Sequence, residues 1–147
     1  MKSRIVLDGS VALAWFFYDE RNEYAEEIAR QHRLLDYVVP KLWRWEIANT
    51  LIMGERRKRC TKEDVTSWLA YLLGMPFQYD DFCFEMAWDQ SLEHARDHRL
   101  TVYDAAYLEL AHRESIPLAT LDLELKKAAE AAGVEVYRTD SFKNRPR

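Results

Sequence analysis

The chain has 147 residues, of which 48% are hydrophobic and 31% are charged, and its formal net charge at pH 7 is −4. These values suit one globular domain with a single core, and they exclude a largely disordered chain and a polycation that coats nucleic acid. The two cysteines, Cys60 and Cys83, are too few for a disulfide framework or a zinc cage, so we expect a reducing compartment.

The N-terminal segment resembles a secretion signal only in part. Lys2 and Arg4 precede an apolar run, but Asp8 and Gly9 interrupt that run and no cleavage site of small residues follows. No stretch reaches the roughly 18 uninterrupted apolar residues that a membrane span needs. We therefore expect a cytoplasmic protein that does not associate with membranes.

Apolar periodicity predicts short strands that alternate with helices. In chain order, the expected elements are a strand at 5–7, helices at 10–17 and 22–33, a strand at 37–39, helices at 41–59, 61–73, 81–97 and 101–113, a strand at 117–120, a helix at 123–132 and a strand at 134–137. Thr61 and Asp64 form a helix-capping pattern, and Gly74 and Gly133 follow expected helix ends.

This alternation predicts an α/β fold. We expect a central parallel sheet of four or five short strands with helices on both faces. The domain is expected to cover residues 1–140, followed by a basic C-terminal tail at 141–147.

Two carboxylates directly follow expected strands. Asp8 comes after the strand at 5–7, and Asp122 comes after the strand at 117–120. Because ligands bind at the carboxyl edge of parallel sheets, both side chains are expected at that edge. Each residue also has a purely structural interpretation, as the N-cap of the helix that follows it.

Two further acids lie within expected helices. Glu46 belongs to a helix that is apolar nearly all round, which predicts cover on more than one side. A carboxylate there must be paired, ligate a metal or face a polar cleft, and Asn49 shares its helix face. Asp104 follows Thr101 by three positions, so a role in capping the helix N-terminus is the alternative.

The four acids together indicate a metal site. Clustered carboxylates raise one another's pKa values unless a cation neutralises them. Oxygen ligands without nearby histidine or cysteine favour Mg²⁺ or Mn²⁺, and such sites activate water for attack on a phosphodiester. Two divalent ions would neutralise four carboxylates, so a loaded site need not repel RNA.

Four segments resemble PIN-domain ribonucleases, and specifically the VapC toxins of prokaryotic toxin–antitoxin pairs. They are Ile5–Phe16, Glu46–Asn49, Leu100–Ala111 and Pro117–Asp122, and the resemblance extends over nearly the whole chain. Gly9 departs from the family, which more usually has Ala, Ser or Thr there, and we expect no loss of function from it. Trp45 is bulkier than the usual aliphatic residue, which favours a role in shaping the cleft or an interface.

The resemblance implies which residues form the site. The acids that would carry catalysis and hold one or two Mg²⁺ or Mn²⁺ ions are Asp8, Glu46, Asp104 and Asp122. The residues that would brace the carboxylates or orient the substrate are Ser10, Asn49 and Thr120. The resemblance also implies cleavage of RNA, a growth-inhibiting toxin, a homodimer and silencing by a cognate antitoxin.

Three other functions are alternatives to a metal-dependent endoribonuclease. A catalytically inactive PIN scaffold that binds protein or RNA is disfavoured because all four acids are present. A phosphatase of the haloacid dehalogenase type needs a second Asp two residues after the first, where this chain has Ser10. A response-regulator receiver needs an acidic pair, a phosphoacceptor Asp and a late Lys that this sequence does not place correctly.

Three more patterns each have a structural and a functional interpretation. The basic run from Arg56 to Arg59 is either a solvated helix end or a contact for RNA or an antitoxin. His94 and His98 have a spacing that can bind zinc, but no third ligand is evident. Six aromatic residues belong either to the core or to an interface: Trp43, Trp45, Trp68, Tyr71, Phe77 and Trp88.

Overall fold

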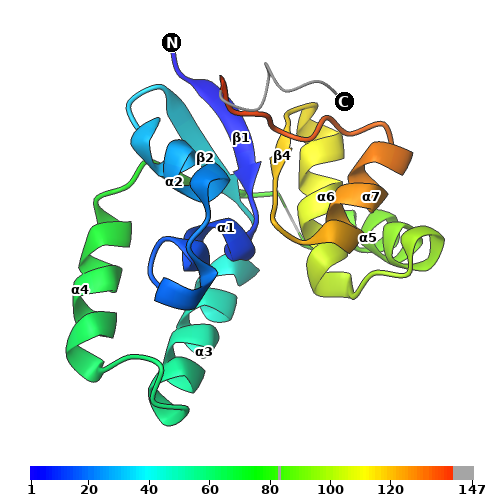
Figure 1. The fold of residues 1–147 in the computed structure, drawn as a ribbon. Coiled ribbons are helices and arrows are strands. Elements are labelled where there is room, and N and C mark those ends of the chain that lie inside the picture. The colour runs from blue at the N-terminus through cyan, green and yellow to red at the C-terminus, as the bar shows by residue number, and fades with distance from the viewer. Residues whose placement is uncertain (83, 141–147) are drawn as a thin grey trace.

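A four-stranded sheet forms the centre of the computed structural model, which describes residues 1–82 and 84–140. Cys83 and the expected tail at 141–147 lie outside the described residues. The strands are β1 (Ser3–Leu7), β2 (Leu35–Val39), β3 (Phe77–Tyr79) and β4 (Leu118–Ala119). They pair in parallel in the order β3-β2-β1-β4, which confirms the predicted fold class (Figure 1).

Seven α-helices and one short 3-10 helix connect the strands in the described part of the chain. They are α1 (Gly9–Ala14), η1 (Tyr18–Glu20), α2 (Glu23–Arg30), α3 (Leu42–Arg56), α4 (Lys62–Leu73), α5 (Phe84–His98), α6 (Val102–Glu114) and α7 (Leu123–Ala131). The α1–α2 segment lies on one side of the sheet and α5, α6 and α7 on the other, while α3 and α4 extend beyond its lower edge (Figure 1). Right-handed crossovers between parallel strands account for this division.

Side-chain caps set several helix ends where the sequence predicts them. Thr61 and Asp64 form a complete capping box at α4, with bonds of 2.9 and 3.1 Å. The Thr101 hydroxyl accepts a hydrogen bond from the backbone N–H of Asp104 at the start of α6 (3.1 Å). Gly133 follows the last turn of α7 with φ of 75°, a left-handed conformation in which glycine carries no steric cost.

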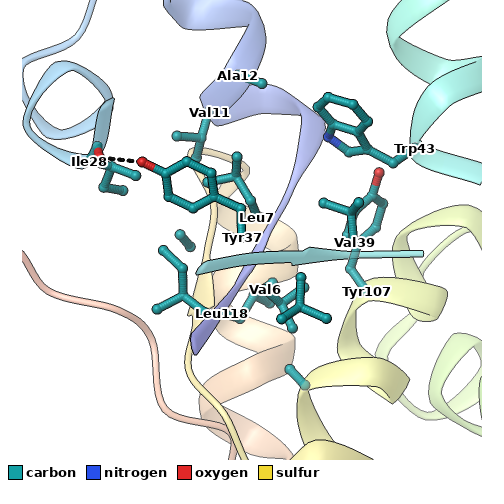
Figure 2. Close-up of a cluster of buried hydrophobic side chains, with 14 of the residues drawn as sticks. Val6, Leu7, Val11, Ala12, Ile28, Tyr37, Val39, Trp43, Tyr107 and Leu118 are labelled. Carbon is teal, nitrogen blue, oxygen red and sulfur yellow. Dashed lines mark hydrogen bonds between the residues drawn. The ribbon is translucent and has the colours of Figure 1, made fainter. Parts of the chain in front are cut away.

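The core lies between the sheet and its helices, and it holds the strands rigidly beneath the site. Val6 and Leu7 of β1, Val39 of β2 and Leu118 of β4 are fully buried (Figure 2). The buried Tyr37 hydroxyl donates a hydrogen bond to the carbonyl oxygen of Ile28 (2.7 Å), which ties α2 to β2. Burial of these side chains stabilises the strand ends from which the functional residues project.

Two strand predictions were incomplete. β3 was not expected, because three residues after Pro76 are too short to give a periodic signal. The strand expected at 134–137 was wrong: only Val136 forms a bridge, with Leu118. Since β4 has only two residues, it offers little backbone for another strand to pair with.

Two helix predictions also need correction. The first helix ends at Ala14 and not at 17, and the Trp15 indole instead donates a hydrogen bond to the carbonyl oxygen of Ala25 (2.7 Å). The α3 helix was expected to be covered on more than one side, but Trp45 is 79% exposed and Ile52 is 40% exposed. One stripe of α3 therefore faces solvent.

The helices of the described residues are too short or too polar to cross a membrane.

Candidate active site

The chain changes direction across the sheet where β1 and β4 lie side by side. β1 leads into α1 on one side, and β4 leads towards α7 on the other (Figure 1). Leu7 pairs with Ala119, and the backbone N–H of Asp8 donates to the carbonyl oxygen of Ala119 (3.0 Å). Such a switch point opens a crevice beyond the carboxyl ends of the strands, and Asp8 lies at its base.

Two hydroxyl groups hold the carboxyl group of Asp8. Its Oδ2 accepts hydrogen bonds from Ser10 Oγ (2.6 Å) and from Thr120 Oγ1 (2.8 Å). Ser10 Oγ in turn accepts the backbone N–H of Leu121 (3.0 Å). Asp8 occupies the N-cap position of α1, but its side chain makes no capping bond. The capping interpretation is therefore wrong for this carboxyl, which is instead fixed towards β4.

The environment of Asp8 favours the protonated acid. Burial, the largest effect, raises the pKa of its carboxyl group, and the hydrogen bonds from Ser10 and Thr120 oppose that rise. The negative charges of Asp104 and Asp122 raise the pKa of Asp8 further. A cation in the crevice would reverse this effect, because it would favour the ionised carboxylates.

Glu46 reaches the same crevice from α3. Its Oε1 accepts a hydrogen bond from the hydroxyl of Tyr107 on α6 (2.6 Å). Burial raises the pKa of Glu46, the Tyr107 bond lowers it, and the charges of Asp8 and Asp104 raise it. Glu46 is thus held by a neutral donor, and no cation pairs with it among the described side chains.

Asp104 and Asp122 complete the acidic group from the first turns of α6 and α7. Thr101 caps α6 and Asp104 is the acidic residue of its first turn, so the interpretation of Asp104 as part of the helix N-terminus also fits the structure. Burial raises the pKa of Asp104, and the charge of Asp122 raises it further. Asp122 does cap its helix, because its Oδ1 accepts the backbone N–H of Leu125 (2.9 Å).

A cavity of about 530 Å³ brings the acids together. Its lining includes five of the predicted site residues: Asp8, Ser10, Glu46, Asp104 and Asp122. Thr120 is buried behind Asp8 and acts on it through the hydrogen bond described above. Asn49 is exposed on α3 and does not line the cavity, so the structure separates it from the other predicted site residues.

The donor set has the chemistry of a site for a hard divalent cation. Within the described residues, no three His, Cys, Asp or Glu side chains converge enough to form a complete metal cage. The four acids nevertheless line one cavity, neighbouring acids raise the pKa values of Asp8, Glu46 and Asp104, and oxygen donors of this kind prefer Mg²⁺ or Mn²⁺. The residues present therefore fit such an ion.

Tyr107 contacts the acidic group, and the sequence did not single it out. It lies three positions after Asp104 on α6, a spacing that places both side chains on one face of the helix. Burial and the neighbouring acids raise the pKa of its hydroxyl, so it stays a neutral donor. The i, i+3 relation to Asp104 is the signal by which Tyr107 could have been found.

The departure at Gly9 fits the observed packing. A Cβ added at Gly9 would lie 3.7 Å from Cδ1 of Ile47, which is ordinary van der Waals contact. The small residues more usual at this position would therefore fit in this chain as well.

Comparison with known proteins identifies the family of this chain. A family model described as the PIN domain matches residues 5–131. The chain is 30% identical over 122 residues to Ribonuclease VapC3 of Pyrobaculum aerophilum, a match that covers 83% of this chain and 92% of that protein.

Two solved structures share the fold. PAE2754 from Pyrobaculum aerophilum has a TM-score of 0.65 at 23% identity, and the match covers 87% of each chain. VapBC2 from Rickettsia felis, crystallised with a DNA fragment from the promoter, has a TM-score of 0.64 at 12% identity and covers 91% of this chain and 97% of that one. Since the family model spans most of the sequence, the chain belongs to the PIN-domain family and, within it, to the VapC proteins.

Proposed function

We propose that this protein is a metal-dependent endoribonuclease and the toxin of a toxin–antitoxin pair. The observation that carries the proposal is the buried Asp8, braced by two hydroxyls in a cavity that it shares with Glu46, Asp104 and Asp122. Among the described residues, Asp8 makes neither a helix-capping bond nor an ion pair, and Asp104 and Asp122 are like-charged neighbours of its carboxyl group. The relative named Ribonuclease VapC3 supports the reaction class.

The residues of the site would have the following roles. Mg²⁺ or Mn²⁺, held by Asp8, Glu46, Asp104 and Asp122, would activate water and stabilise the leaving oxygen. Ser10 and Thr120 keep the Asp8 carboxyl in one orientation, and Tyr107 does the same for Glu46.

The direct test is cleavage of RNA by the purified protein with Mg²⁺ or Mn²⁺, compared with the same reaction in excess EDTA. We expect cleavage only with metal. Asp8→Asn keeps an oxygen that accepts from Ser10 and Thr120 but loses the negative charge, and it is expected to lower the rate at least about a hundredfold. Asp89→Asn, at an exposed acid on α5, is the matched control and should cleave as the wild type does.

Two results would contradict this function. Full cleavage in EDTA would exclude the metal, and full activity of Asp8→Asn would exclude the carboxylate site. Binding of RNA without any cleavage would instead support the alternative, an inactive PIN scaffold.

Partner surfaces are available for the antitoxin and for a second copy. A cavity of about 550 Å³ opens between α1, α2 and α4, and its aromatic lining is Trp15, Phe16, Tyr18, Trp68 and Tyr71. Such an aromatic cavity suits apolar side chains of a protein partner, and the solved VapBC2 complex supports an antitoxin as that partner. Exposed Trp45 and Leu73 offer further apolar area for a homodimer. Light scattering after size-exclusion chromatography would test the dimer.

A further inference from the structure

The acidic cavity extends away from the carboxylates along α1 and α3. Besides the acids, its lining includes Leu13 near the end of α1, Thr50 one turn beyond Glu46 on α3, and Glu20 of η1. The lining of this cavity of about 530 Å³ therefore includes both the proposed site of cleavage and Glu20 of η1.

A basic segment is anchored beside η1. Arg59, which follows α3, donates hydrogen bonds from Nη2 to both carboxylate oxygens of Asp19 (2.8 and 3.1 Å). The same nitrogen lies 3.5 Å from Oε1 of Glu20, and the guanidinium lies 4.1 Å from the centre of the Phe17 ring. Because Glu20 lines the cavity, these contacts fix the basic segment Arg56–Arg59 beside the cavity mouth.

Arg57 and Lys58 present their charges to solvent at this position. Both side chains are exposed, and neither forms an ion pair with a carboxylate in the described part of the chain. Lys58 has φ of 58°, the left-handed region that glycine usually occupies after a helix. A lysine in this conformation costs some backbone strain, but it places a positive charge where a glycine would place none.

The spacing from the acids to these cations matches an extended nucleic-acid strand. Eleven positions of α3 and its C-cap separate Glu46 from Arg57, or about 16 Å at 1.5 Å per residue. A strand of a few nucleotides covers that length. A phosphate at its end would meet Arg57, whose planar guanidinium binds phosphate oxygens in pairs, and Lys58 as a second cation.

We propose that the RNA strand runs from the carboxylates along the cavity between α1 and α3, and that Arg57 and Lys58 hold a backbone phosphate a few nucleotides from the cleaved bond. This inference rests on the ribonuclease function proposed above. RNA is favoured over an acidic protein because the two cations precede Arg59, which pairs with Glu20 in the lining of the cavity that holds the acids. In a protein of net charge −4, cations beside the path also offset the repulsion between the acids and RNA.

The first experiment measures kcat and KM for RNA cleavage by R57Q/K58Q. We expect KM to rise about tenfold and kcat to stay within about twofold, because the cations bind substrate away from the reacting bond. The plot of log KM against log salt should become shallower by about 0.7, the value for one phosphate of a single strand that is no longer neutralised. Thermal melting should match the wild type, since both side chains are exposed.

The matched control is R30Q/R33Q. It removes two positive charges from exposed side chains at the end of α2 and in the following loop, near the amino end of β2, opposite the edge that carries the acids. Its KM and salt dependence should equal those of the wild type. An equal rise of KM in both double variants would mean that net charge acts in general, and it would overturn the path.

A second measurement uses RNAs shortened by one nucleotide at a time from either end. For the wild type, KM should rise at the step that removes the phosphate bound by Arg57 and Lys58, and R57Q/K58Q should not respond to that step. Unchanged KM and salt dependence in R57Q/K58Q would overturn the path, and loss of binding to a protein partner alone would assign these cations to that partner. Absence of metal-dependent cleavage by the wild type would overturn the proposed function itself.

Discussion

Tyr107 illustrates how a residue without charge sets the state of the acidic group. Its hydroxyl is 2.6 Å from Oε1 of Glu46, in a site where burial already raises the pKa of that carboxyl. Without this donor, the Glu46 side chain is free to rotate and the pKa of its carboxyl group rises further. The hydroxyl thereby orients a carboxylate that the proposed ion needs.

We therefore expect Tyr107→Phe to lower RNA cleavage about 10-fold to 100-fold at limiting metal, as loss of a residue that orients a metal ligand does. Cleavage rates over a series of Mn²⁺ concentrations would measure this. Tyr103→Phe, at an exposed tyrosine on the same helix, is the control and should leave the rates unchanged. Equal rates for wild type and Tyr107→Phe would show that Glu46 needs no such support.

Two glycines should respond in opposite ways to the same change. A Cβ at Gly9 meets only ordinary contacts, so Gly9→Ala should stabilise the protein by about 0.4–1 kcal/mol through the unfolded state. A Cβ at Gly54 would lie 2.9 Å from Cζ of Phe17 and 3.1 Å from Sγ of Cys60, so Gly54→Ala should destabilise it by about 1–3 kcal/mol. Urea unfolding of the two variants would measure both effects, and a stable Gly54→Ala would contradict the tight packing.

At the scale of elements, the α5–α6 pair carries a cluster of imidazoles. His94 lies 6.1 Å from His98 and 5.7 Å from His112 between ring centres, so the structure supplies a third histidine that the sequence did not reveal. Burial lowers the pKa of His94, as do His112 and His98, while Glu109 and Asp97 oppose this effect. The folded protein therefore holds His94 neutral at pH values where the unfolded chain is already protonated.

The consequence is a loss of stability in acid. Because the folded pKa of His94 is below the ordinary histidine value of 6.5, its contribution to stability is complete above that pH and is lost as pH falls through the folded pKa. The free energy of unfolding should thus decrease below about pH 6.5, and His94→Gln should decrease less. Urea titrations between pH 8 and pH 5 would test this, and parallel curves for the two proteins would contradict it.

The elements that the sequence predicts well are those with strong local signals. The helix from 101 was expected from Thr101 and its apolar face, and α6 is found at Val102–Glu114. β3 was not predicted, because its three residues pair only with β2, which is distant in the sequence. The six aromatics could not be sorted, because exposure depends on packing: Trp43 is buried, while Trp45, Tyr71 and Trp88 are exposed.

The same difference between local signals and long-range contacts applies to the candidate site. Asp8 and Asp122 were expected at one edge because each follows a strand, a local feature. The contact between Glu46 and Tyr107 joins residues 61 positions apart and needs the fold to be seen. The solvent exposure of Asn49 likewise depends on how α3 packs. The apolar composition of α3 predicted that more of the helix would be covered.

At the scale of the whole molecule, the proposed toxin should act in a living cell. Expression in a bacterial host is expected to arrest growth, and Asp104→Ala should relieve the arrest because it removes one acid from the shared cavity. Growth curves with matched protein levels would measure this. Equal arrest by both proteins would mean that toxicity does not come from the carboxylate site.

The pairing of β1 with β4 has a consequence for the order of events during synthesis. Thr120 and Asp8 are 112 positions apart, and β4 is the last strand of the described sheet. A nascent chain that ends before β4 already contains Asp8, Glu46 and Asp104, yet it lacks the hydroxyl and the strand that hold Asp8 in place. The proposed nuclease therefore assembles only after residue 120 has left the ribosome, so an incomplete chain is harmless to the RNA of the cell that makes it.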